Sequence, residues 1–168
     1  MTGVKDPREL FLHGLKDMYY AEQLIVKKLP GMIDEATDEE LQEGLRRHLE
    51  QTREQVSNLE QVFEELGEQA QGETCPGMDG LVKEHDEFVK KEDPPAAVLD
   101  TFLTGAAARV EHYEIAAYNG LVSSAKAMGE DAAAKLLEKN LAQEHEALAL
   151  VEAVGSRLVE SQAREVAA

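Results

Sequence analysis

The chain has 168 residues, of which 43% are hydrophobic and 30% charged, a balance typical of one globular domain rather than of a disordered chain. Its formal net charge of −17 would be repelled by phosphate backbones, so we expect no nucleic-acid partner. No apolar run approaches the roughly 20 residues that a membrane span needs, and residues 1–8 show no apolar signal region. A single cysteine, Cys75, excludes an internal disulfide, and we expect a cytoplasmic protein.

Helix start and stop signals divide the chain into four long helices and one short helix. Asp6-Pro7 is a start signal, and Pro30-Gly31 is expected to kink or end the first helix. Thr37-Asp38-Glu39-Glu40 has the pattern of a capping box, while Gly67 and Gly129 are stop signals. Residues 68–80 are expected to form a loop and residues 159–168 a fraying tail. The predicted helices are 7–36, 38–66, 81–91, 96–128 and 131–158, with approximate ends.

No strand pattern is found, so residues 1–168 are predicted to form one all-α domain. The long helices would pair into two hairpins and build an antiparallel four-helix bundle, with the short helix between the hairpins. A bundle of this kind places its functional side chains on the inward faces of its helices.

Three of the long helices carry a glutamate in their apolar stripe. Leu15, Glu22 and Leu29 are spaced by seven residues and share one helix face. Glu114 and Glu144 lie near the centres of the stripes of the third and fourth long helices. We therefore predict that all three glutamates point into the core.

The second long helix supplies a different set of polar side chains. His48 lies on the apolar face, with Gln51 and Gln55 at its flank. Glu114 and Glu144 are each 15 residues from the turn at Gly129, while Glu22 and Gln51 lie at similar distances from the turn near residue 37. Equal numbers of residues from a turn mean equal heights in the bundle. Side chains from all four long helices are thus expected to meet in one layer.

Such a layer of carboxylates needs compensation, because an isolated buried carboxylate is costly and clustered ones repel. Either the carboxyls hold protons at raised pKa values or a cation binds among them. Mixed carboxylate and imidazole ligands suit iron, manganese or zinc better than calcium. A single inward glutamate could be a chance feature, but three at one level favour a metal site.

Other candidates lie around this layer. Glu111 lies one turn before Glu114 and about 60° from the stripe centre, which is compatible with a bridging ligand or with a boundary residue. His112 and His145 are expected to face away from the core. The remaining candidates are interpreted as packing or structural residues: Tyr19, Tyr113, Tyr118 and Cys75.

Several segments together resemble the YciE/YciF family of ferritin-like proteins. The matching stretches are Asp17–Gln23, His48–Gln55, Cys75–Leu81, Val110–Tyr118 and Leu141–Glu144. The resemblance implies a ferritin-like four-helix bundle, a dinuclear iron-type centre, a role in bacterial stress responses and a homodimer.

The chain departs from the ferritin-like pattern, in which two helices each give a Glu-x-x-His pair. The second long helix offers His48 and Gln51, where relatives often have an acid at the second position, and Ala147 stands three residues after Glu144. These departures leave open a centre with few ligands, a centre with water, or a centre with one ion.

Two hypotheses follow. In the first, one or two irons bind to a site drawn from Glu22, His48, Gln51, Glu111, Glu114 and Glu144, and Fe(II) is oxidised by oxygen or peroxide. In the second, the chain is a non-catalytic helical stress or scaffold protein with a vestigial or structural metal site.

Overall fold

The computed structural model describes residues 3–167, which form four long helices and one shorter helix. The part of the chain that is described contains no strand. The helices are α1 (Pro7–Glu35), α2 (Glu39–Glu65), α3 (Pro76–Glu92), α4 (Ala96–Ala127) and α5 (Asp131–Val166). The predicted all-α, ferritin-like four-helix bundle with an additional short helix is confirmed.

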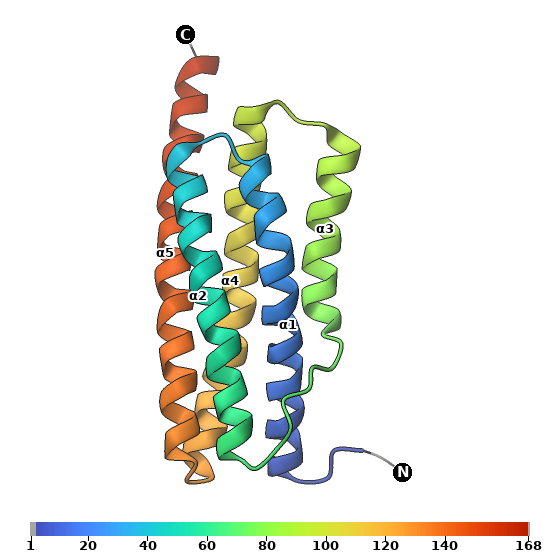
Figure 1. Cartoon of the computed structure of the whole chain (residues 1–168). Coiled ribbons are helices and arrows are strands. Elements are labelled where there is room, and N and C mark those ends of the chain that lie inside the picture. The colour runs from blue at the N-terminus through green and yellow to red at the C-terminus, as the bar shows by residue number, and fades with distance from the viewer. Residues whose placement is uncertain (1–2, 168) are drawn as a thin grey trace.

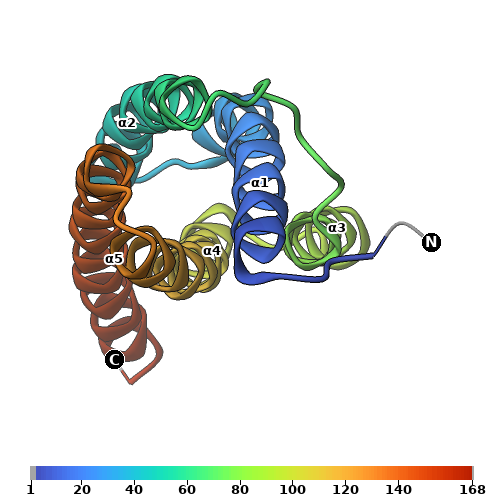
Figure 2. The ribbon, with the colours of Figure 1, turned by 90° about the horizontal axis from the view of Figure 1, so that it is seen from below.

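The four long helices form a bundle in which each helix is antiparallel to both of its neighbours (Figure 1). Seen along its axis, the bundle has α1 beside α2 and α4, and α5 beside α2 and α4 (Figure 2). α2 and α4 therefore run parallel, and the chain must return along the bundle between them. The loop after α2 and the helix α3 make this return outside the bundle, against α1 and α4.

The first two helices begin at aspartate caps. Asp6 accepts a hydrogen bond from the Glu9 amide at 2.8 Å, with Pro7 at the first helical position. The cap of α2 is Asp38, which accepts from the Leu41 amide at 3.0 Å. The cap of α2 is therefore Asp38 rather than Thr37, with which the predicted capping box began.

α1 continues through Pro30 to Glu35, so the proline does not end it, and its end lies within one residue of the predicted end at residue 36. Two other helix boundaries differ from the sequence prediction. α3 begins at Pro76 instead of near residue 81, because the buried Cys75 sulfur accepts from the Met78 amide at 3.4 Å and Pro76 fits the first helical position. α5 continues to Val166, beyond the predicted end near residue 158.

Two apolar clusters fill the bundle, one toward each end. The first contains Phe11, Leu15, Phe63 and Leu137, and the second contains Ile25, Leu29, Leu45, Leu103 and Val154. Along every long helix, the switch from one cluster to the other falls where the predicted polar layer lies. None of the helices described is long and apolar enough to cross a membrane.

The turn between α1 and α2 is fastened to α4 by a buried carboxylate. Asp100 accepts from the Thr37 amide at 2.7 Å and from its hydroxyl at 2.6 Å. Replacing Asp100 by alanine would leave two donors without their partner, and such a loss costs about 1–3 kcal/mol.

We therefore predict that Asp100→Ala lowers the free energy of unfolding in urea by about 2 kcal/mol. The exposed Asp34, near the same turn, provides the control, and Asp34→Ala should stay within about 0.5 kcal/mol of the parent chain. Equal stabilities of the two variants would contradict a fastening role for Asp100.

Candidate metal centre

The polar layer between the two apolar clusters is built from all four long helices. α1 contributes Glu22, α2 contributes His48, α4 contributes Glu111 and Glu114, and α5 contributes Glu144. Each of these residues is at most 6% exposed. The inward direction predicted for the three stripe glutamates is confirmed, and Glu111 joins them.

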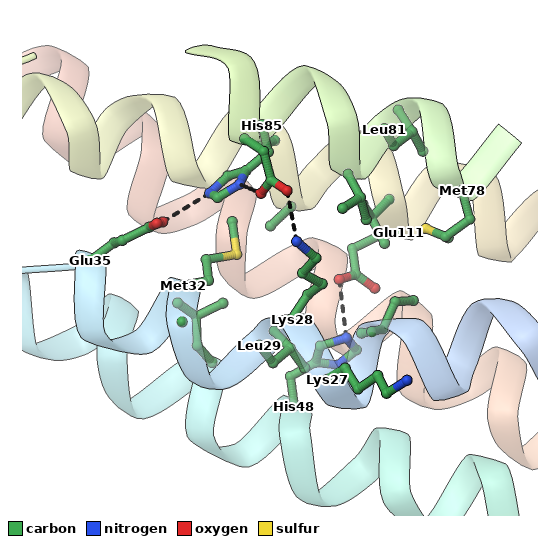
Figure 3. Close-up of a pocket in the computed structure, with 18 residues that line it drawn as sticks. Lys27, Lys28, Leu29, Met32, Glu35, His48, Met78, Leu81, His85 and Glu111 are labelled. Atoms are coloured by element: carbon green, nitrogen blue, oxygen red, sulfur yellow. Dashed lines mark hydrogen bonds and ion pairs between the residues drawn. The ribbon is translucent and has the colours of Figure 1, made fainter. Parts of the chain in front are cut away.

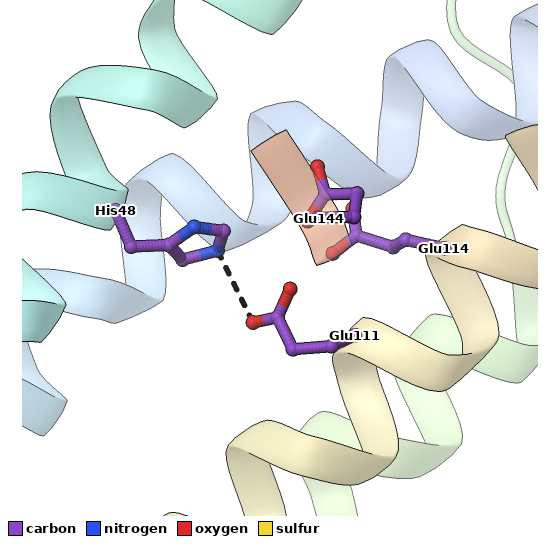
Figure 4. A group of neighbouring side chains, drawn as sticks. All are labelled: His48, Glu111, Glu114 and Glu144. Carbon is purple, nitrogen blue, oxygen red and sulfur yellow. Dashed lines mark ion pairs between the residues drawn. The ribbon is translucent and has the colours of Figure 1, made fainter. Parts of the chain in front are cut away.

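Four of these residues come close enough to share one ion. One potential ligand atom from each of His48, Glu111, Glu114 and Glu144 lies within 4.8 Å of the other three. Their side chains converge from three helices (Figure 4). Ligands about 2.0–2.2 Å from one transition-metal ion are separated by no more than about 4.4 Å, so small side-chain adjustments would suffice.

Glu22 lies beside this group of four and is held by a hydrogen-bonded chain. The Tyr118 hydroxyl donates to Glu22 Oε1, and the Asn140 amide donates to the Tyr118 hydroxyl at 3.0 Å. Tyr118 is fully buried, as expected for a packing residue, and it also holds Glu22, a role that was not predicted. Its position one turn after Glu114, on the same helix face, is the signal that could have revealed it.

Gln55 of α2 also belongs to the polar layer. It is fully buried, and its side-chain amide donates to Glu144 Oε1. Gln51, included among the candidate ligands, lies outside the group of four. It is only partly buried, and its amide donates to Glu146 Oε2 at 3.3 Å. Gln55 orients one glutamate, whereas Gln51 links α2 to α5 beside the centre.

Buried polar atoms without a hydrogen-bond partner gather in this layer. Both Glu114 oxygens lack a partner, and His48 Nε2 approaches Glu111 Oε1 at 3.3 Å without the orientation of a hydrogen bond. None of the ion pairs of residues 3–167 brings a lysine or arginine to these glutamates. The other buried side-chain nitrogens and oxygens of the described chain that lack a partner are His48 Nδ1 and one oxygen each of Glu22, Gln55, Glu111, Gln143 and Glu144. A cation is the partner that such a donor set fits.

Burial dominates the electrostatics of the layer. It raises the pKa of Glu22, Glu114 and Glu144 well above the ordinary value, with further raising by neighbouring carboxylates. Burial likewise raises the pKa of Glu111 to about 7. It lowers the pKa of His48 to about 4, so the imidazole is neutral at pH 7 and free to bind a metal. In the absence of a cation, these raised pKa values favour the protonated forms of Glu22, Glu114 and Glu144.

Other singled-out residues have structural or surface positions. The buried Cys75 sulfur lies 3.0 Å from the Tyr113 hydroxyl, and burial raises the pKa of the thiol, which favours the unreactive form. His145 is exposed, and His112 faces Glu152 across 3.8 Å at the surface. The predictions that both histidines face away from the core are confirmed.

The fold and the polar layer define a ferritin-like bundle protein with a candidate metal centre. The chain belongs to the family described as Domain of unknown function (DUF892), whose model matches residues 6–164. It is 34% identical over 142 residues to Protein YciF of Escherichia coli (strain K12), covering 84% of this chain and 85% of that protein. The predicted YciE/YciF relationship is confirmed.

Two solved structures have the same fold over nearly their whole length. YcfI, a candidate structural protein from Rhodopseudomonas palustris, is 44% identical and gives a TM-score of 0.87, over 89% of this chain and 94% of that one. The structure of the E. coli stress protein YciF is 31% identical and gives a TM-score of 0.88, over 94% of this chain and 99% of that one.

The raised pKa values predict how the stability of the metal-free protein depends on pH. A group whose pKa is higher in the folded state stabilises it below the unfolded-state pKa, and this contribution is lost as the pH rises to the folded-state pKa. His48 acts in the opposite direction, but only below its unfolded-state pKa of 6.5.

We therefore predict that the melting temperature of chelator-treated protein falls steadily from pH 6.5 to pH 8. Each buried carboxyl that keeps its proton contributes a slope of about 1.4 kcal/mol per pH unit. Glu114→Gln should make the fall shallower, whereas Glu146→Gln, which changes an exposed acid, should not. A melting temperature that stays constant or rises over this range would show that the layer is not protonated.

Proposed function

We propose that the protein binds iron in the polar layer and oxidises Fe(II) with oxygen or peroxide. The observation that supports this most strongly is the convergence of His48, Glu111, Glu114 and Glu144 within 4.8 Å, with oxygens that lack any partner. Glu22 adds a further carboxylate beside them, which would suit a second ion. Gln51, on the rim, would act on ions entering between α2 and α5.

The donor set argues for a transition metal. Carboxylates combined with a neutral imidazole suit iron, manganese and zinc. Zinc has no redox chemistry, and carboxylate oxygens stabilise the ferric state, so iron accounts best for an arrangement this rich in acids. Binding would release the protons that the buried glutamates hold in the metal-free protein.

The proposed reaction consumes two Fe(II) ions for each molecule of hydrogen peroxide. Two Fe(II) ions each give one electron to hydrogen peroxide, its O–O bond breaks, and two protons complete two water molecules. In this reaction the residues of the layer have separate tasks. His48 and the glutamates bind the substrate ions, Tyr118 holds Glu22, and Gln55 holds Glu144. The apolar clusters on both sides limit the access of bulk water.

The relatives bear on the physiological role. YciF of E. coli is described as a stress protein, and oxidation of Fe(II) with removal of peroxide would suit a stress response here. We retain the cytoplasm as the predicted location and a homodimer as the predicted assembly. Both still rest on the sequence.

A second function is favoured by one observation. The pattern of two Glu-x-x-His pairs is absent from the centre, whose α2 side carries His48 and Gln55. A structural or scaffold protein in which a bound ion only stabilises the bundle would also explain the layer. The candidate structural role given to YcfI is compatible with this alternative.

Metal analysis and a stopped-flow assay distinguish the two functions. We predict that purified protein binds one or two irons per chain and oxidises added Fe(II) in the presence of peroxide, seen as the rise of ferric absorbance. The double variant Glu114→Gln, Glu144→Gln should lose at least half of the bound iron and most of the oxidation, because it replaces two carboxylate ligands by neutral amides.

Glu152→Gln is the matched control, since it changes an exposed acid of α5 that lies away from the layer and from the rim at Gln51. Iron binding that persists unchanged in the double variant would refute the site. Binding that raises the melting temperature without Fe(II) oxidation would establish the structural alternative.

A further inference from the structure

A cavity of about 240 Å³ lies between α1, α3 and α4, outside the four-helix core. Its inner end reaches His48 and Glu111, on one side of the polar layer (Figure 3). Its outer end lies near Lys28 and His85, where α1 faces α3. The cavity thus connects the outside of the bundle with one edge of the candidate metal centre.

The walls of the cavity are mostly apolar. Ile25, Leu29, Leu81 and Val110 supply branched aliphatic surface, and both Met32 and Met78 line it with thioether side chains. Apolar walls offer water few hydrogen-bond partners, and engineered cavities of this character remain dry and bind apolar molecules. Methionine sulfur also makes favourable contacts with aromatic rings.

The inner end differs from the walls because it is polar and unsatisfied. Glu111 Oε2 and both ring nitrogens of His48 lack hydrogen-bond partners, and the two side chains are 2% and 6% exposed. A ligand with a hydroxyl group at this end would supply the missing hydrogen bond. An anionic head group is disfavoured there, because its charge would be buried without a partner of opposite charge beside Glu111.

The volume sets the size of the ligand. Benzene fits a cavity of about 150 Å³, so the larger cavity found here has room for one ring with a substituent. We infer that the cavity binds a small neutral phenol, with its ring between Met32 and Met78 and its hydroxyl group directed at Glu111 and His48. The inference goes beyond the proposed function, since this binding requires no metal.

The polar contacts at the outer end allow entry. Lys28 pairs with Asp86 at 2.7 Å and His85 with Glu35 at 2.9 Å, and each pair joins α1 to α3 (Figure 3). Lys28 and Asp86 are both about half exposed, and pairs of this kind contribute little to stability. Breaking the Lys28–Asp86 pair to admit a ligand would therefore cost little free energy.

The test uses the full chain, treated with chelator, and the probe 4-fluorophenol. Titration followed by ¹⁹F NMR should show saturable binding at one site per chain. 4-Fluorotoluene has the same ring with a methyl group in place of the hydroxyl, and we expect it to bind about tenfold more weakly because it cannot satisfy Glu111. Glu111→Leu should remove this preference.

A substitution that fills the cavity provides a second test. Ala107 lines the cavity and its neighbour Ala108 does not, so Ala107→Leu should weaken 4-fluorophenol binding more than tenfold while Ala108→Leu leaves it unchanged. Transfer of nuclear magnetisation from the probe ring to the methyl groups of Met32 and Met78 locates the ligand in the parent chain, without any variant.

The absence of saturable binding, or binding without transfer to these methionines, would overturn the inference. Equal affinities for the two probes would do the same, because the hydroxyl group would then not be recognised. Since the protein is metal-free throughout, these outcomes are independent of whether it oxidises Fe(II).

Discussion

The burial of like charges in the middle of an apolar bundle is the constraint on which the rest of this structure depends. Four glutamates lie in one layer with almost no access to solvent, and their mutual repulsion must be relieved by protons or by a cation. The surrounding residues serve this requirement. Tyr118 and Gln55 each donate to one carboxylate, and two apolar clusters keep the layer separated from bulk water.

The layer is approached differently from its two sides. Between α2 and α5, Gln51 and Glu146 form a polar rim beside His48. On the side covered by α3, the approach is apolar and ends at Glu111. A charged substrate and an uncharged one would thus meet different surfaces before reaching the same pair of residues. The position of α3 outside the bundle creates this difference.

Much of the fold and the direction of the core glutamates could be predicted from the sequence, because helix geometry is regular. Glu22, Glu114 and Glu144 recur within apolar stripes, and their heights follow from counting residues from the turns. Counting gives only positions along and around a helix axis, however. Counting residues made Gln51 a candidate ligand. Around the axis of α2, however, the direction of Gln55 differs by only about 20° from that of His48.

The remaining errors have equally local causes. The start of α3 was missed because Cys75 is an unusual cap and the glycines after it suggest a loop. The hydrogen bond of Tyr118 was missed because its hydroxyl group lies far from the backbone, where a helical wheel gives no information. Such contacts depend on how neighbouring helices pack, which a single sequence does not state.

The position of the polar layer between two apolar clusters also governs the alignment of the helices. Apolar stripes alone specify the alignment of neighbouring helices less strictly, since cores tolerate hydrophobic substitutions that keep the total volume and the pattern. A slipped α1 would carry Glu22 away from Tyr118 and into one of the apolar clusters, where nothing could accommodate its charge. The side chains whose burial costs the most free energy therefore favour a single alignment of the four helices.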